Sequence, residues 1–430
     1  MTNICVIGAG HVGLVTGACF AELGNSVICT DDDVKKIEGL KNDVLPFYEP
    51  GLEVMVVQNK RAGRLSFTHS LGDSIAGSDI IFVAVGTPQK SNGEADLTSI
   101  ENVARRIACA LDGYKLIVEK STVPIKTGDW IHRTIKLNCK KGVEFDIASN
   151  PEFLREGTAV HDFMQPDRIV LGVETEKAAR LLVELYKPIH APVVRTNVKT
   201  AELIKHASNS FLALKISYIN AISNICEKTG ADVLKVAEGM GYDKRIGKDF
   251  LNAGVGYGGY CLPKDISAFI KMAEEIGYDF ELLKAVQRVN DYQRQRIVRK
   301  AKDALWNLQG KTVGVLGLAF KPDTDDMRES PSIYIIRELQ KQEVLIKAYD
   351  PQAMDTAKNF LQDVEYCQNP YEAASGSDVL IFLTEWDEFK NLDFVKIKRL
   401  LKQPIIIDGR NIFDPLAMKE YGLTYFGIGR

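Results

Sequence analysis

The sequence predicts an α/β fold with two doubly wound domains joined by a long central helix. Apolar strands rich in Val and Ile alternate with helical stretches through the first half of the chain, and the same alternation returns near the C-terminus. Continuous apolar strands separated by helices are typical of a parallel sheet covered on both faces. Between the two halves lies a helical stretch that is apolar on most of its circumference. Such a helix is expected to be buried between domains or against a partner subunit.

The strands of the first domain are expected at residues 4–7, 26–30, 80–85, 116–119, 145–148 and 169–172. The second domain repeats the pattern at residues 312–316, 344–349, 379–383 and 405–408. The central helix is expected over about 199–230, with Gly230 as its C-terminal stop. We therefore divide the chain into an N-terminal domain (1–198), a central helical domain (199–305) and a C-terminal domain (306–430).

The composition is that of a globular protein, with 45% hydrophobic and 26% charged residues among 430. The formal net charge is -3 and the two signs are interspersed, so neither nucleic acid nor a membrane surface is the expected partner. The N-terminus lacks a signal-peptide pattern and no stretch approaches the roughly 18 apolar residues of a spanning helix, which favours a cytoplasmic location. The cysteines are scattered without CxxC or His/Cys clusters. We expect neither disulfides nor a metal site.

A glycine-rich turn follows the first expected strand. Gly8, Gly10 and Gly13 have the G-x-G-x-x-G spacing, and an apolar helix over 14–23 comes next. This context is typical of a Rossmann-like turn that holds a dinucleotide pyrophosphate at a helix N-terminus. The second strand ends at Asp31, where a carboxylate binds the ribose hydroxyls and repels a 2′-phosphate, so NAD is favoured over NADP. A glycine-rich turn without a nucleotide is the alternative.

Two later strands end in hydroxyl-bearing turns. Thr87 follows the strand at 80–85, and Thr122 follows the strand at 116–119. Ligands of open parallel sheets lie beyond the carboxyl ends of the strands, so both threonines are candidates for cofactor or substrate contact. Capping of the following helices is an equally good interpretation of their spacing.

The stretch GVGYGGYCLPKD, residues 254–265, places Cys261 between a glycine-rich loop and an expected helix. Pro263 and Asp265 fall in the first turn of that helix, and Gly277 is its expected stop. A thiolate is stabilised at the positive end of a helix. The local sequence leaves two interpretations open: a reactive nucleophile, or one more small apolar residue.

Two further groups of polar residues stand out. Lys205 and Asn209 are one turn apart on the central helix, where a buried lysine needs a partner or a role. The alternative is that the aliphatic part of the Lys205 side chain lies on apolar surface while its ammonium group stays in water. Glu152 and Glu156 follow the strand at 145–148 and suit acid–base chemistry or contact with a cofactor or water. They also suit ordinary charges at a helix N-terminus.

Taken together, these stretches resemble the UDP-glucose/GDP-mannose dehydrogenase family over essentially the whole chain. The motifs that carry the resemblance are GAGHVG (8–13) with Asp31, PFYEPGL (46–52), VGTP (85–88), KSTVP (120–124), NPEFLREGTA (150–159), AELIKHASNSFLALKISYIN (201–220), GYGGYCLPKD (256–265), GLAFKPDTDDMRES (317–330) and DGRNIFD (408–414).

The resemblance implies an NAD-dependent four-electron oxidation of UDP-glucose to UDP-glucuronate through a thiohemiacetal and a thioester on Cys261. Another nucleotide sugar, a UDP-N-acetylhexosamine or GDP-mannose, is the alternative substrate. Two-electron hydroxyacid dehydrogenases share the glycine fingerprint and central helix but have no need of Cys261. A nucleotide-sensing protein without chemistry would be expected to lack Cys261 or Lys205, and both are present.

The resemblance also implies site residues and an assembly. Lys205 would stabilise negative charge on the substrate oxygen, Asn209 and Asp265 would hold it and a water, and Thr122 and Glu152 would share acid–base roles, with the first proton acceptor left open. Arg245 would reach into a neighbouring subunit, which requires a homodimer or higher homo-oligomer. The implied catalytic residues are Cys261, Lys205, Asn209, Asp265, Glu152 and Thr122. The implied cofactor residues are Gly8, Gly10, Val12, Gly13, Asp31, Lys36, Thr87, Thr122, Glu156, Lys264 and Arg328. The implied residues for the UDP-sugar are Glu152, Phe153, Leu154, Arg155, Lys205, Asn209, Arg245, Phe250, Leu251, Asn252, Ala253, Gly254, Gly258, Lys321 and Arg410.

Two residues depart from the family pattern in turns that face the cofactor. His11 fills a slot that is often aromatic, and Lys126 stands where relatives commonly carry glycine. Neither replaces an assigned group, so we expect an effect on affinity rather than on activity.

Overall fold

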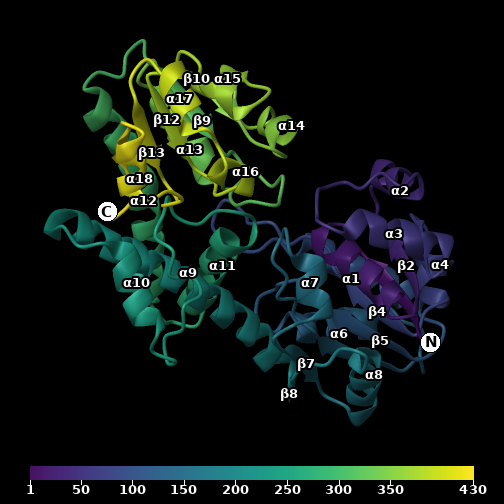
Figure 1. The fold of residues 1–430 in the computed structure, drawn as a ribbon. Helices are drawn as coiled ribbons and strands as arrows, with labels where there is room; N and C mark the ends of the chain where they lie inside the picture. The colour runs from purple at the N-terminus through teal and green to yellow at the C-terminus, as the bar shows by residue number, and fades with distance from the viewer. The chain divides into compact units, whose positions relative to one another are not determined.

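The computed structural model describes residues 1–430 and contains two sheets covered by helices (Figure 1). The first sheet has eight strands in the order β3-β2-β1-β4-β5-β6-β7-β8, and the second has six in the order β11-β10-β9-β12-β13-β14. From its own first strand each sheet grows in both directions, which is the doubly wound arrangement. The predicted α/β fold class, with two such sheets and a long helix between them in the chain, is confirmed.

The first sheet and its helices alternate regularly along the chain. The strands are β1 (Asn3–Ile7), β2 (Ser26–Thr30), β3 (Leu65–Thr68), β4 (Ile80–Val83), β5 (Lys115–Glu119), β6 (Phe145–Ser149), β7 (Ile169–Val173) and β8 (Val193–Thr196). The helices are α1 (His11–Glu22), α2 (Val34–Lys41), α3 (Leu52–Arg61), α4 (Leu71–Ala76), α5 (Thr98–Ala110), α6 (Thr127–Asn138), α7 (Ala159–Met164) and α8 (Glu176–Tyr186).

The predicted strands of this sheet are all present, but two features differ from the prediction. β3 and β8 were not predicted, and both are four-residue strands at the sheet edges, where alternating or exposed side chains replace a continuous apolar run. The expectation of a wholly parallel sheet is wrong at one pair, because β7 runs antiparallel to β6. An apolar run shows that a strand is buried and carries no information on its direction.

The second sheet follows the same plan with shorter edges. Its strands are β9 (Thr312–Leu316), β10 (Leu345–Tyr349), β11 (Val364–Tyr366), β12 (Val379–Phe382), β13 (Ile405–Asp408) and β14 (Thr424–Phe426), all paired in parallel. Its helices are α13 (Pro331–Gln340), α14 (Met354–Ala357), α15 (Pro370–Ala374), α16 (Asp387–Lys390), α17 (Phe394–Leu400) and α18 (Pro415–Glu420). The unpredicted strands β11 and β14 again lie at the edges, with three residues each.

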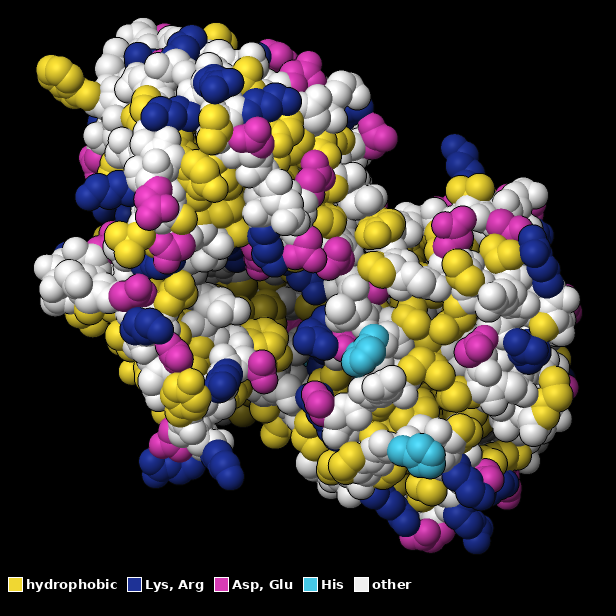
Figure 2. Space-filling model, viewed as in Figure 1, with side chains coloured by type: hydrophobic (Ala, Val, Ile, Leu, Met, Phe, Trp, Pro, Cys, Tyr) yellow, Lys and Arg dark blue, Asp and Glu magenta, His cyan; other side chains and the backbone are white.

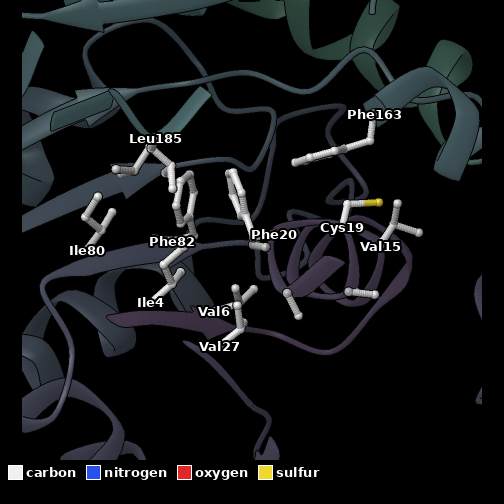
Figure 3. Packing of buried hydrophobic residues seen from close by; sticks show 14 of the residues in the cluster. Ile4, Val6, Val15, Cys19, Phe20, Val27, Ile80, Phe82, Phe163 and Leu185 are labelled. Carbon is white, nitrogen blue, oxygen red and sulfur yellow. The ribbon is translucent and has the colours of Figure 1, made fainter. Parts of the chain in front are cut away.

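Helix α1 packs its apolar face on the first sheet (Figure 3). Phe20 of α1 and Phe82 of β4 have ring centroids 5.0 Å apart, and Val6 and Val27 of the two adjacent strands are fully or almost fully buried. Cys29 is also buried in this layer, and burial raises the pKa of its thiol. The core thus fixes β1 and α1, and with them the glycine turn between the two.

The helices between the sheets in sequence are α9 (Val198–Thr229), α10 (Val233–Gly241), α11 (Cys261–Glu275) and α12 (Glu281–Leu305). Gly230 has a φ of +76°, which is the left-handed conformation of a helix stop, as predicted. Contacts along the chain define two compact units, residues 1–208 with 267–277 and residues 209–266 with 278–430. The division into three domains stays a prediction.

The surface carries both signs of charge. On the face seen in Figure 2, Lys and Arg side chains are interspersed with Asp and Glu. None of the helices combines the length and the apolar character that crossing a membrane would require.

Candidate active site

The glycine turn after β1 has the shape that a dinucleotide site requires. A Cβ added to Gly8, whose φ is +100°, would lie 2.6 Å from the Ala84 oxygen, and one on Gly13 would lie 1.8 Å from the Gly8 oxygen. A Cβ on Gly10 would meet nothing within 4 Å, and no side chain caps the N-terminus of α1 there. The first and third glycines are therefore required by packing. The second leaves an open surface beside free helix N–H groups, which fits a pyrophosphate.

Asp31 lies directly after β2 and is turned back toward the glycine turn. Its Oδ2 accepts hydrogen bonds from the Ala9 backbone N–H and the Lys36 ammonium, both at 2.8 Å. Burial opposes ionisation of Asp31, but hydrogen bonds from Lys36, Asp33 and Ala9 outweigh it and hold the pKa of the carboxyl below its usual range. The residues present thus fit a bound NAD: an anion cradle and a charged carboxylate at the end of the next strand.

Glu49 is a functional candidate that the sequence reasoning did not single out. Its buried carboxylate accepts hydrogen bonds from the backbone N–H groups of Gly157 and Ala159, at 2.7 and 2.8 Å. It also lies 2.6 Å from Nε2 of His11, whose ring contacts Phe47. Glu49 therefore ties the glycine turn to the segment after β6. Its place in the PFYEPGL motif was the available signal.

Lys205 and Glu152 form a buried pair in the first unit. Nζ of Lys205 donates to Oε1 of Glu152 at 2.9 Å, and each side chain is 4% exposed. The other oxygen, Oε2, accepts from the backbone N–H of Leu154 at 2.6 Å. The alternative of a lysine head in water is therefore excluded. The Arg168 guanidinium stacks on the Phe153 ring, 3.5 Å from the ring centroid, and the Lys205 ammonium lies 5.3 Å from the same centroid.

The two predicted threonines meet at the carboxyl edge of the first sheet. The hydroxyl of Thr87, which is buried, donates to the backbone oxygen of Thr122 at 2.8 Å. The turns after β4 and β5 are thereby held together, and neither threonine is the N-cap of a helix. Lys126 is the N-cap of α6 with a φ of +79°, a conformation that explains why glycine is favoured there.

Asn209 and Asp265 are paired in the second unit. Nδ2 of Asn209 donates to Oδ2 of Asp265 at 2.6 Å, while the Lys264 ammonium donates to Oδ1 at 2.7 Å. Cys261 is the first residue of α11 and is partly exposed, and Asp265 lies one turn further along that helix. The helix begins two residues earlier than Pro263, so the thiol is at the positive helix end as predicted. The prediction that Asp265 falls in the first turn is wrong, because the earlier start moves it beyond that turn.

The glycines before Cys261 pack against protein. A Cβ would lie 2.9 Å from the Gly409 oxygen at Gly254, 2.5 Å from the Asn290 side chain at Gly256 and 2.4 Å from the Glu329 oxygen at Gly258. Phe250 at the start of the loop has a φ of +62°. The loop is therefore a tightly packed and specifically shaped segment of the second unit rather than a slack one.

The remaining predicted residues occupy several settings. Arg410 donates to the backbone oxygens of Leu383 and Phe320, both at 2.9 Å. The Arg328 guanidinium stacks 4.3 Å from the Tyr260 ring, next to Cys261. Arg155 pairs with Asp162, and Arg245 pairs with Asp243 with its side chain 89% exposed. Leu251 and Ala253 are buried, Val12, Phe153, Leu154, Glu156 and Lys321 are partly exposed, and Asn252 is exposed.

Three family models match the chain in order. They describe the NAD binding domain (residues 2–190), the central domain (199–292) and the UDP binding domain (314–415) of the UDP-glucose/GDP-mannose dehydrogenase family. The expected NAD cofactor and oxidoreductase class are thereby confirmed, and a UDP-containing ligand is supported.

Full-length relatives are similar to this chain. Two Bacillus subtilis proteins named UDP-glucose 6-dehydrogenase are 50% and 48% identical, each over 100% of this chain and over 94% and 98% of their own lengths. A solved structure of a UDP-glucose dehydrogenase from Pyrobaculum islandicum has a TM-score of 0.93 at 39% identity, covering 100% of this chain and 98% of that one. A UDP-D-ManNAc dehydrogenase from Pyrococcus horikoshii has a TM-score of 0.87 at 27% identity, covering 99% of each.

Proposed function

Because the chain belongs to the UDP-glucose/GDP-mannose dehydrogenase family, we propose that it oxidises UDP-glucose to UDP-glucuronate. The observation that carries this proposal is the 50% identity over the whole chain to a protein named UDP-glucose 6-dehydrogenase. The balanced reaction converts one primary alcohol, two NAD⁺ and one water into one carboxylate, two NADH and three protons. Another nucleotide sugar is the second candidate, since the fold is also similar to that of a UDP-D-ManNAc dehydrogenase.

We assign the first oxidation to the residues around Lys205. Two NAD molecules, bound in succession, would each supply the hydride acceptor for one oxidation. The Lys205 ammonium, kept in place by Glu152, stabilises the negative charge that develops on the C6 oxygen of the sugar. Glu152 and Thr122 share the transfer of the hydroxyl proton, and the hydrogen bond from Lys205 places one Glu152 oxygen beside the group that stabilises the C6 oxygen. The product of this step is a C6 aldehyde.

We assign the second oxidation to Cys261. Its thiolate attacks the aldehyde carbon, a C–S bond forms, and the oxygen takes a proton to give a thiohemiacetal. Loss of hydride from C6 and of the hydroxyl proton then gives a thioester. Water attacks the thioester, the C–S bond breaks, and the carboxylate and the thiol are released. Asp265, oriented by Asn209 and Lys264, is placed one turn from Cys261 and suits the positioning of that water.

The ligands would be held by the remaining predicted residues. For NAD these are the glycine turn with Val12, Asp31 with Lys36, and Thr87, Glu156, Lys264 and Arg328. For the UDP-sugar these are residues 152–155, the loop 250–254, Gly258, Lys321 and Arg410. Arginine and lysine suit the pyrophosphate because they form charge-assisted hydrogen bonds. The cytoplasmic location stays a prediction.

We further propose that the protein is a homodimer or a higher homo-oligomer. Phe211, Tyr218 and Ile225 recur every seven residues on α9 and are 60%, 49% and 57% exposed. A seven-residue apolar repeat is the pattern by which two helices pack along each other, so a second copy of α9 is the occupant that fits. Sedimentation would detect the assembly, and Phe211→Glu should dissociate it. A wild-type monomer would refute this part of the proposal.

One experiment tests the reaction. Purified protein is supplied with NAD and a panel of nucleotide sugars, and NADH is counted against sugar consumed. We expect UDP-glucose to be the preferred substrate and about two NADH to form per sugar. A ratio near one would favour a simple alcohol dehydrogenase, and preference for an N-acetylhexosamine would select the second candidate.

The Cys261→Ser variant tests covalent catalysis. Serine lacks a thiolate and cannot form the thioester, so net UDP-glucuronate formation should fall by about 10³-fold or more while UDP-glucose binding persists. Product is measured by chromatography and binding by calorimetry. Full turnover by this variant would refute the assigned role of Cys261.

A further inference from the structure

Lys120 is a buried lysine in the first unit to which the proposed mechanism gives no role. It follows β5 directly and is 4% exposed. Its ammonium donates to Oδ1 of Asn150 at 2.9 Å and to the hydroxyl of Tyr186 at 3.4 Å. Both partners are neutral, and no carboxylate lies within salt-bridge distance. Burying an ammonium with neutral partners alone is costly, so the residue requires an explanation beyond packing.

The Lys120 site is built as a rigid network. The Tyr186 hydroxyl also donates to Oδ1 of Asn150, at 2.5 Å. Nδ2 of Asn150 donates to the Val170 oxygen at 2.9 Å, and its backbone N–H donates to the Glu119 oxygen at 2.8 Å. The amide of Asn150 is therefore fixed at both ends. Because Glu152 lies only two residues further along, the network also fixes where the segment after β6 begins.

The charged groups around Lys120 belong to the proposed reaction site. Glu152 from the segment after β6 attracts the ammonium, and Lys205 from α9 repels it. Tyr186 of α8 is the remaining titratable group in contact with Lys120, and Glu152 also attracts the Arg168 guanidinium. Burial first, and Lys205 after it, lower the pKa of Lys120 to about 7, while Glu152 opposes them. The charge of Lys120 therefore changes in the physiological pH range.

We propose that Lys120 is a positioning residue for the oxidation, which holds Glu152 in place through Asn150 and sets the electrostatic balance of the Glu152–Lys205 pair. This inference rests on the proposed function of that pair. A protonated Lys120 adds a second positive charge beside Glu152 and supports stabilisation of the substrate oxygen. A neutral Lys120 withdraws that support without breaking the network, because an amine still donates a hydrogen bond.

The pH dependence of kcat separates this role from a purely structural one. For Lys120→Met we expect the ratio of wild-type to variant kcat to be largest at pH 6, where the variant lacks both the charge and the hydrogen bonds of Lys120. The ratio should fall by about tenfold by pH 8.5, where wild-type Lys120 is neutral and only the lost hydrogen bonds distinguish the two proteins. Lys120→Arg, which keeps its charge, should match wild type at pH 6. Tyr186→Phe is the matched control, since it removes a hydrogen bond to Asn150 without changing charge, and its ratio should not vary with pH. A constant ratio for Lys120→Met would overturn the inference.

A measurement without substrate tests the same coupling. In protein with ¹³C-labelled lysine, the Cε resonance that Lys120→Met removes should titrate near pH 7. Glu152→Gln should lower this midpoint and Lys205→Met should raise it, and an unchanged midpoint in both would overturn the inference. If the midpoints move as expected while wild type oxidises no nucleotide sugar, the proposed function fails and the coupling stands. If turnover is normal but no midpoint moves, the coupling alone fails.

Discussion

The two sheets share the same order of six strands and differ in the turns and side chains at the ends of those strands. The strand order from the first edge is the same in both, β3-β2-β1-β4-β5-β6 in one and β11-β10-β9-β12-β13-β14 in the other. Each first strand is followed by a glycine with positive φ, Gly8 at +100° and Gly317 at +94°. A Cβ on either glycine would lie 2.5–2.6 Å from atoms of the turn after the neighbouring strand, at Ala84 or Thr384. Each second strand is followed by an aspartate, Asp31 or Asp350, that accepts hydrogen bonds from backbone N–H groups after that glycine.

Asp31 and Asp350, which follow the second strand of each sheet, differ in burial and in hydrogen bonding. Asp31 is half-buried and accepts hydrogen bonds from one backbone N–H of the glycine turn and from the Lys36 ammonium. Asp350 is 1% exposed and accepts five hydrogen bonds, including one from Nε1 of Trp386 at 3.2 Å. In the first unit α1 starts three residues after Gly8, whereas in the second α13 starts only at Pro331. The same strand order therefore supports an open anion-binding turn in the first unit and a buried, hydrogen-bonded aspartate in the second. Function thus depends on the turn after the first strand and not on the sheet.

The largest effect expected from this contrast is on stability, in Asp350→Asn. The amide offers one acceptor oxygen where the carboxylate offers two, so at least two of the five buried donors would face an NH₂ group. We expect the free energy of unfolding of the second unit to fall by about 3 kcal/mol. Chemical denaturation measures it. A loss below about 1 kcal/mol would break the contrast, because Asp350 would then be no more structural than Asp31.

The sequence predicts the buried strands of the two sheets better than the edge strands and the turns. Buried strands are long apolar runs and are therefore visible, whereas the edge strands β3 and β14 are short and partly polar. The glycine fingerprint identifies the first turn because Gly8, Gly10 and Gly13 all have local spacing. The turn after Gly317 lacks the G-x-G-x-x-G spacing, so the sequence does not show that it corresponds to the turn after Gly8. The structure shows the correspondence, because Asp350 accepts hydrogen bonds from backbone N–H groups of that turn.

The site residues were predictable to the extent that their motifs are local. Lys205 is visible as a polar residue on an apolar helix, but its partner Glu152 lies 53 residues away, and nothing in the spacing pairs the two. Lys120 lies within the KSTVP motif (120–124), yet its burial against Tyr186 depends on a helix that starts more than 50 residues later. Residues that act through buried long-range contacts are thus the ones that sequence reasoning misses.

An intermediate effect is expected on affinity, in Asp31→Asn. Loss of the carboxylate should weaken NAD binding by about tenfold and narrow the preference against NADP, because the repulsion of a 2′-phosphate is removed. The free energy of unfolding should change by only about 1 kcal/mol, since Asp31 is partly hydrated. Calorimetry with both dinucleotides, beside the same denaturation series as for Asp350→Asn, checks both parts. Unchanged binding of NAD and NADP would mean that the ribose contact is misassigned.

A second matched position extends the contrast to the strands that follow β4 and β12. β5 ends in Glu119 and β13 ends in Asp408, and both carboxyls are buried. Asp408 accepts hydrogen bonds from the backbone N–H groups of Arg410 and Phe413 and from the Tyr425 hydroxyl. Glu119 instead faces another carboxyl, that of Glu202, whose oxygens accept from the N–H groups of Lys126 and Gly128. Burial, and then Glu202, raise the pKa of Glu119 well above its usual range, and burial raises the pKa of Glu202 to about 7.

The smallest effect expected is therefore on the pH dependence of stability, in Glu119→Gln. Both carboxyls favour the protonated form in the folded protein, so their contribution is fully present below about pH 4.5 and is lost as pH rises through their folded pKa values. The amide of the variant is neutral at every pH and donates to Glu202, so at pH 8 the variant should be more stable than wild type by about 1 kcal/mol and less dependent on pH between 6 and 8.5. Asp408→Asn is the matched control and should be destabilised at pH 8, because the amide has only one of the two oxygens that accept from Arg410, Phe413 and Tyr425. Destabilisation of Glu119→Gln at pH 8 would show that Glu119 acts there as an ionised acceptor, as Asp31 does, and would remove this difference between the two sheets.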